Sequence, residues 1–163
     1  MADTNRLVNR NEWAAYMKTA ESVYSIIGEG FTALTENKNA KEYSRQYVHE
    51  KTERTDVTGY ATSIAYSCDV YSEDPVIQKL IEITDNEKVG TDAQVEIVSV
   101  NLWQTGGAEN SYVAYQRKYA VIPDSKGNGT DALVYSGNLK AVGDVVKGTF
   151  TITGGTGSFS AGA

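Results

Sequence analysis

The chain has 163 residues, 40% of them hydrophobic, and a formal net charge of −6 at pH 7. Its length fits one globular domain spanning 1–163. Its net negative charge argues against a nucleic-acid-binding site, which needs a basic surface to displace counterions. No apolar run approaches the roughly 18 residues that a transmembrane helix needs. A single cysteine excludes an intrachain disulfide, and no secretory signal pattern is seen, so we expect synthesis in a cytoplasm.

The first third of the chain alternates between polar stretches and one apolar segment. Residues 1–20 are mostly polar and predict an N-terminal arm or one or two helical turns. The segment 22–35 is rich in β-branched and aromatic residues, which predicts a strand that bends or bulges at Gly28 or Gly30. Residues 36–56 show no sustained apolar periodicity and predict a long loop, which in a compact domain is either functional or disordered.

The segment 57–71 alternates between large and small side chains, as a strand with two different faces does. The bulky face holds Tyr60, Thr62, Ile64, Tyr66, Cys68 and Val70. The opposite face, from Gly59 to Asp69, is small or polar, and we expect that it lines water.

A helix is predicted over about 74–85. Asp74 is a favourable N-cap residue, and Pro75 suits the first helical position. The apolar stripe of this helix consists of Val76, Ile77, Leu80, Ile81 and Thr84.

The remaining residues predict further strands separated by turns. The strands are 92–103, 111–123, 131–141 and 148–155, with Gly-, Asn- and Asp-rich turns between them, including 142–147. Residues 154–163 predict a weakly structured C-terminal tail. Many strands, one helix and no strand–helix alternation indicate a mainly β protein, an antiparallel β-sandwich or barrel with one flanking α-helix.

No constellation of residues indicates catalysis. The only histidine, His49, has no nucleophile partner at a recognisable spacing, and no G-x-S-x-G elbow is present. One His and one Cys do not make a zinc site. The segment 124–131 faintly resembles a calcium loop, but Lys126 stands at its third ligand position, so we interpret it as a turn. Cys68 is expected to be a small buried hydrophobe. We therefore expect no enzyme, no metal and no cofactor.

The charged segment between 41 and 56 is the most unusual stretch. It carries four basic and four acidic side chains, whereas a nucleic-acid patch is one-sided. A balanced segment suits a contact between copies of one chain, in which both signs find partners, and a mobile solvated loop fits equally well. The candidate contact residues are Lys41, Glu42, Tyr43, Arg45, Tyr47, His49, Glu50, Lys51, Glu53, Arg54 and Asp56.

Three segments in this order resemble the tail tube (major tail) proteins of phages of Gram-positive bacteria and of phage-tail-like particles: 28–60, 74–100 and 118–153. The most specific features are the charged loop between two strands, the strand-to-helix step at Asp74-Pro75, and the closing Tyr-Ser-Gly-Asn-Leu-Lys-Ala-x-Gly pattern. The resemblance spans roughly residues 22 to 153.

The resemblance implies a tail-tube-like β-sandwich with a flanking helix. Six subunits would form a ring, and rings would stack into a hollow tube in the virion tail through which DNA passes without adhering. The implied partners are other copies of the chain, a tape-measure protein inside the tube, and tail terminator and baseplate or tail-tip proteins at its ends. The resemblance leaves open whether the tail is contractile, and whether the particle is a phage or a tail-like bacteriocin.

An acidic lumen fits such a tube, because a wall that neutralised phosphates would hold the DNA. The acids within predicted strands, Glu29, Asp69 and Glu96, are the candidates for that wall. Reversing the charges of Arg45 and Arg54 is expected to block assembly without unfolding the monomer. The alternative function is a monomeric β-sandwich carbohydrate-binding module that uses exposed tyrosines and Trp103, and a hydrolase is the weakest hypothesis.

Overall fold

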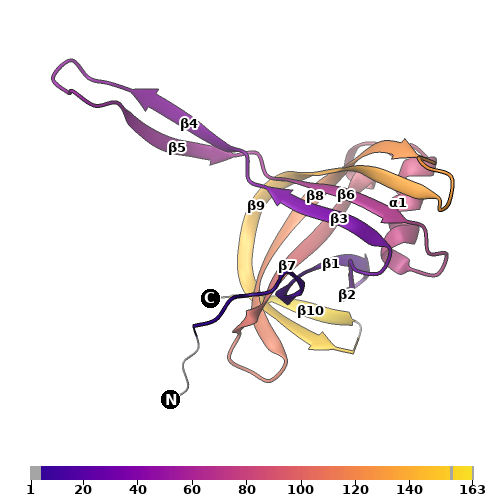
Figure 1. The fold of residues 1–163 in the computed structure, drawn as a ribbon. Coiled ribbons are helices and arrows are strands. Elements are labelled where there is room, and N and C mark those ends of the chain that lie inside the picture. Colours follow the sequence, from indigo (N-terminus) through magenta and orange to yellow (C-terminus); the bar gives the residue numbers. More distant parts are fainter. Residues whose placement is uncertain (1–4, 155, 163) are drawn as a thin grey trace.

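The computed structural model describes residues 5–154 and 156–162, and it is mainly β with one α-helix in this part of the chain (Figure 1). In chain order the elements are η1 (Arg10–Glu12), β1 (Trp13–Ala20), β2 (Val23–Ile26), β3 (Phe31–Asn37), β4 (Ala40–Arg45), β5 (Arg54–Tyr60), β6 (Ser63–Asp69), α1 (Pro75–Asp85), η2 (Gly90–Ala93), β7 (Gln94–Thr105), β8 (Ser111–Lys126), β9 (Val134–Thr153) and β10 (Thr156–Ala161).

The main sheet closes into a barrel. Its order is β10-β2-β1-β7-β8-β9, all antiparallel, and β10 pairs again with β9 to complete the ring. The two ends of β9 have different neighbours. Residues 134–140 pair with β6, which carries β3 on its far side, whereas residues 148–153 pair with β10. The predicted fold class, an antiparallel β-structure with one flanking helix, is confirmed.

Two hydrophobic cores lie on opposite faces of the barrel wall. One fills the barrel interior and contains Tyr16, Tyr24, Val98, Val100, Ala114 and Phe150. The other lies between the outer wall and α1 and includes Met17, Val76, Leu80, Ile97 and Tyr119. Because successive side chains of a strand point to opposite faces, the neighbours Ile97 and Val98 are buried in different cores.

The helix begins as the sequence predicts. The side chain of Asp74 accepts hydrogen bonds from the backbone N–H groups of Val76 (2.9 Å) and Ile77 (3.2 Å), and Pro75 occupies the first turn. The buried side chains are Val76, Ile77, Leu80 and Ile83. Of the other predicted stripe residues, Ile81 is half-buried and packs against the cluster of Cys68, Ile77 and Tyr135, and Thr84 is half-buried. The stripe prediction missed Ile83, which is buried.

Two predicted single strands are each divided in the structure. The segment 22–35 forms β2 in the barrel and β3 at the edge of the sheet. The chain turns between them at Gly30, where φ is +91° and a Cβ atom would lie 2.8 Å from the carbonyl oxygen of Asp69. The segment 57–71 breaks after Tyr60, and only its second part, β6, belongs to the main sheet. The bulky face of β6 is buried as predicted, through Ile64, Tyr66 and Cys68.

The predicted N-terminal arm and the predicted weakly structured tail both contain strands of the barrel wall. The predicted N-terminal arm includes β1, which lies between β2 and β7. Three consecutive residues of β1, from Ala15 to Met17, are buried, so its sequence lacks the alternation that predicts a strand. The supposed tail includes β10. The predicted turn at 142–147 was also wrong, because β9 continues through an irregularity there. Residues 1–4, 155 and 163 of the predicted arm and tail lie outside the described residues.

Candidate functional site

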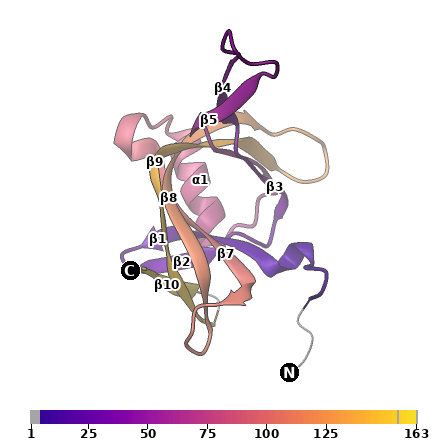
Figure 2. The ribbon, with the colours of Figure 1, turned by 90° about the vertical axis from the view of Figure 1, so that its left-hand side faces the viewer.

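The predicted long loop is a β-hairpin that projects from the barrel (Figures 1 and 2). Strands β4 and β5 pair antiparallel from Ala40 opposite Tyr60 to the tip, and they continue the ribbon of β3 and β6. At the joint, Asn39 adopts a positive φ of 48° and donates from its side chain to the carbonyl of Ala61 (3.0 Å) and the hydroxyl of Ser63 (3.2 Å). A residue in the left-handed region therefore sets the direction in which the hairpin leaves the body.

The hairpin lacks apolar periodicity because neither of its faces lies on the core. All the candidate contact residues lie in it or in its tip, and apart from the half-buried Arg45 and Glu50 they are exposed. At the tip, Val48 is fully exposed, with a relative accessibility of 107%. A two-stranded hairpin is marginally stable alone in water. Such a surface gains stability when another molecule covers it.

One face of the hairpin carries a stack of aromatic and guanidinium groups. The guanidinium of Arg45 lies 4.8 Å from the ring centroid of Tyr43 and 5.7 Å from that of Tyr47. Arg54 lies 5.4 Å from the same Tyr47 ring, and His49 stacks on it with centroids 6.4 Å apart. Cation–π contacts of this kind order the face before any partner arrives.

Half of the predicted charges pair within the hairpin. Arg45 and Asp56 form an ion pair at 2.5 Å, and hydrogen bonds to Tyr47 and Asp56 raise the pKa of Arg45. Arg54 forms an ion pair with Glu50, whose other carboxylate oxygen accepts from the backbone N–H of Tyr47 at 3.1 Å. The tip is therefore ordered by its own contacts.

The other half of the charges remain available to a partner. Among the described residues, Lys41, Glu42, Lys51 and Glu53 form no ion pair. These four, rather than the two arginines, are the side chains that a neighbouring molecule can pair without breaking contacts inside the hairpin.

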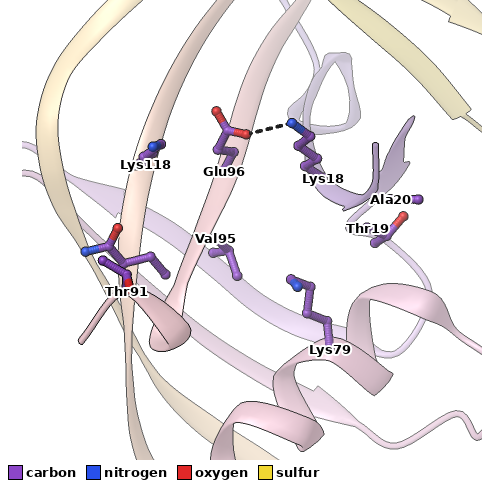
Figure 3. A pocket seen from close by; sticks show the side chains of 9 residues that line it. Lys18, Thr19, Ala20, Lys79, Thr91, Val95, Glu96 and Lys118 are labelled. Carbon is purple, nitrogen blue, oxygen red and sulfur yellow. Dashed lines mark ion pairs between the residues drawn. The ribbon is translucent and has the colours of Figure 1, made fainter. Parts of the chain in front are cut away.

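Of the three predicted lumen acids, Glu29 and Asp69 are neighbours, because the backbone N–H of Asp69 donates to the carbonyl of Gly30 at 2.7 Å, whereas Glu96 has other surroundings. Glu29 lies in the turn between β2 and β3 and not within a strand, while Asp69 ends β6. Glu96 of β7 forms an ion pair with Lys18 at 3.2 Å and lies in a pocket of about 380 Å³ that Lys79 and Lys118 also line (Figure 3). Its immediate surroundings are therefore basic. That these acids face a lumen stays a prediction.

A second hollow, which we name the Trp recess, has a volume of about 490 Å³. Both tryptophans of the chain line it, and sequence reasoning had singled out only Trp103, because it gave no sign that β1 and β7 are neighbours. Its lining consists of Trp13, Glu36, Lys38, Ser99, Asn101, Trp103, Tyr115, Arg117, Tyr119 and Val145.

The catalytic candidates lie apart from one another. His49 is exposed at the hairpin tip, whereas Cys68 is fully buried in β6, and burial raises the pKa of its thiol to about 11. The described residues contain no group of three His, Cys, Asp or Glu side chains arranged to hold a metal ion. No helix in the described part of the chain is long and apolar enough to cross a membrane.

Neither the models of known protein families nor the curated proteins match this sequence. Solved structures do match the fold. A chain of the extended sheath-tube complex of an extracellular contractile injection system (PVC) aligns with a TM-score of 0.52 at 9% identity, covering 86% of this chain and 90% of that one. The fold is tail-tube-like.

Two chains of gene transfer agent particles have the same fold. One from the virion of the native particle aligns with a TM-score of 0.54 at 13% identity, covering 95% of this chain and 100% of that one. One from the tail of the empty particle, which has C6 symmetry, aligns with a TM-score of 0.53 at 12% identity, covering 85% and 97%. The TM-scores show a shared fold, and the low identities show that the sequences have diverged widely.

Proposed function

We propose that the chain is a structural protein that assembles with copies of itself into stacked hexameric rings, forming the hollow tail tube of a phage or phage-tail-like particle. The observation that carries this proposal is the exposed hairpin projecting from a tail-tube-like barrel. The chains with this fold include one in a particle tail with C6 symmetry.

The hairpin suits a contact between unlike surfaces of neighbouring copies. A hairpin on one side of a subunit that meets a different surface on the next makes a head-to-tail contact, and such contacts close into rings or extend into filaments. Tyr and Arg, which are enriched in the energetic centres of interfaces, form the stack on the hairpin face. The unpaired charges beside them fix the orientation of the partner.

A tail tube also accounts for the acidic charge of the chain and defines its partners and its location. The net charge of −6 favours a passage in which DNA moves without binding. The partners are then further copies along the tube, a tape-measure protein inside it, and terminator and baseplate or tail-tip proteins at its ends. The site of action is the tail, after synthesis in the host cytoplasm, and no catalytic step is required.

Negative-stain electron microscopy and sedimentation of the purified chain test this proposal. We expect rings or hollow tubes with sixfold symmetry, and only monomers at high concentration would overturn it. The double charge swap Lys51→Glu with Glu53→Lys keeps the net charge and leaves the internal ion pairs intact, so it is expected to prevent assembly while the circular dichroism spectrum stays unchanged. Reversal of Arg45 and Arg54 is less specific, because it also breaks the pairs with Asp56 and Glu50.

The Trp recess supports a second candidate, the monomeric carbohydrate-binding module. The exposed ring of Trp103 beside Arg117 and Asn101 is the kind of surface that sugars stack on and hydrogen-bond to. Isothermal titration with bacterial cell-wall glycan fragments distinguishes the two functions. Saturable binding by a monomer that forms no tubes supports the module, and tubes without glycan binding exclude it.

A further inference from the structure

We propose that the Trp recess is the seat for the hairpin tip of a second copy of this chain, an inference that rests on the proposed assembly. The recess has aromatic rings and a guanidinium without an ion pair, and the tip has an exposed apolar side chain and a carboxylate without one, among the described residues. Their match is both apolar and electrostatic.

The recess presents aromatic surface and one unsatisfied cation. The Nε atom of Arg117 is buried and has no hydrogen-bond partner in the described part of the chain, and a buried donor of this kind lowers stability. Trp103 is 41% exposed beside it, and Trp13 is half-buried with the guanidinium of Arg10 at 4.9 Å from its ring. Trp, Tyr and Arg together are the composition of an interface centre.

The hairpin tip has an apolar side chain and an acidic side chain that complement the tryptophan rings and Arg117 of the recess. Val48 is a fully exposed apolar side chain, and Glu53, on the other side of the tip, has a carboxylate without an ion pair among the described residues. Val48 fits against the tryptophan rings, where its apolar surface leaves water. The carboxylate of Glu53 supplies an anion to the guanidinium of Arg117, which forms no ion pair among the described residues, in a charge-assisted contact.

The geometry places this contact between copies. The hairpin runs away from the barrel in both views, and strands of six and seven residues hold its tip about 20 Å from the joint (Figures 1 and 2). The recess lies on the body, and Glu36 and Lys38 at its rim directly precede the joint. Each copy therefore offers a tip to one neighbour and a recess near its own hairpin base to another, which is a head-to-tail contact that repeats.

Disulfide trapping in the full-length assembling chain tests the contact. Val48→Cys places a thiol on the tip, and Val145→Cys places one on the recess, where Val145 is 49% exposed. The native Cys68 is fully buried and does not compete. When the two single variants are mixed in equal amounts and oxidised, we expect Val48–Val145 heterodimers, and the double variant is expected to give a ladder of higher oligomers on non-reducing gels.

The matched control moves the second thiol away from the recess. Val89→Cys is 79% exposed, precedes η2 and does not line the recess, so paired with Val48→Cys it is expected to give no ladder. Tubes that form while the Val48/Val145 pair cross-links no better than this control overturn the docking proposal and leave the proposed function standing. Failure of the unmodified chain to form rings or tubes overturns the proposed function itself.

Charge exchange tests the polar half of the contact. Glu53→Arg and Arg117→Glu are each expected to lower the yield of the Val48–Val145 cross-link about tenfold, and combining them is expected to restore it. Equal losses in the single and combined variants would overturn the pairing of Glu53 with Arg117. Saturable glycan binding that Trp103→Ala abolishes would assign the recess to a sugar and overturn the docking proposal.

Discussion

A variant that lacks the hairpin is expected to fold but not to assemble into tubes. The backbone N–H of Ala61 already donates to the carbonyl of Asn39 at 3.2 Å, so residues 40–60 can be replaced by an Asn-Gly turn that closes the ribbon where it leaves the barrel. Residues 40–60 contribute no side chain to the buried clusters, so the deletion removes almost no buried apolar area. Shortening a connection from about 20 residues to two lowers the entropy cost of closing it by about 2 kcal/mol.

We therefore expect the free energy of unfolding to stay unchanged or to rise by up to about 2 kcal/mol. Urea unfolding followed by circular dichroism measures this, while electron microscopy of the same sample is expected to show no tubes. A narrower change replaces only the tip, residues 46–53, by an Asn-Gly turn between the paired residues Arg45 and Arg54 and keeps the stem. A loss of more than about 3 kcal/mol in the full deletion would show that the hairpin belongs to the folding unit, refuting the reasoning from burial.

Three further predictions concern the body of the domain, each measured by urea unfolding. Asp74→Ala removes the acceptor of two backbone N–H groups and is expected to cost about 1 kcal/mol, whereas Glu73→Ala in the preceding turn changes little; equal losses would contradict the capping role. Phe150→Ala empties the centre of the barrel, where the ring is fully buried and lies 4.5 Å from the ring of Tyr16, and is expected to cost about 3–5 kcal/mol; a cost below about 1 kcal/mol would contradict a packed interior. Hydrogen bonds from Lys126 and then Tyr135 lower the pKa of Asp85, so its contribution is present above the unfolded carboxyl pKa of about 3.9 and is lost as the pH falls through the folded value. The stability difference between the native chain and Asp85→Asn should accordingly shrink from pH 6 to pH 2, and a constant difference would show that the charge is not responsible.

Local signals in the sequence predicted local structure well. The helix follows from Asp74, Pro75 and an apolar stripe, because capping and helical periodicity depend on residues within a few positions of one another. Strand β6 follows from its alternation. The number of strands and the flanking helix were enough to predict the fold class.

The pairing of strands that are distant in the sequence could not be predicted from the sequence. Gly143 and Asp144 are typical of a turn, yet β9 continues past them because pairing with β8 resumes on both sides, at Val142 and Val146. Gly157 was predicted in a weakly structured tail, but a Cβ atom there would lie 2.4 Å from the ring of Phe150, so this glycine allows close packing inside the barrel.

The sequence predicted which residues belong to the candidate site but not the secondary structure that they form. The residues of the charged segment lie together in the hairpin, but they were expected in a loop, because a ribbon with two solvated faces carries no periodic signal. The internal pairing of Arg45 and Arg54 depends on the register of β4 and β5. The Trp recess unites residues from β1, β3, β7, β8 and β9, which only the folded chain brings together.

The continuity of the projecting ribbon with the body also decides how the domain bears load. Strand β5 leads through Ala61 and Thr62 into β6, which pairs with β9 along its whole length, from Ser63 to Asp69. A neighbour that pulls on the hairpin along its axis draws β6 lengthwise past β9, so the hydrogen bonds of that ladder are strained in shear and share the force. They do not open one after another, as they would if β6 were peeled away from its end. A tube built through such hairpins would carry tension through the strongest direction of its sheets.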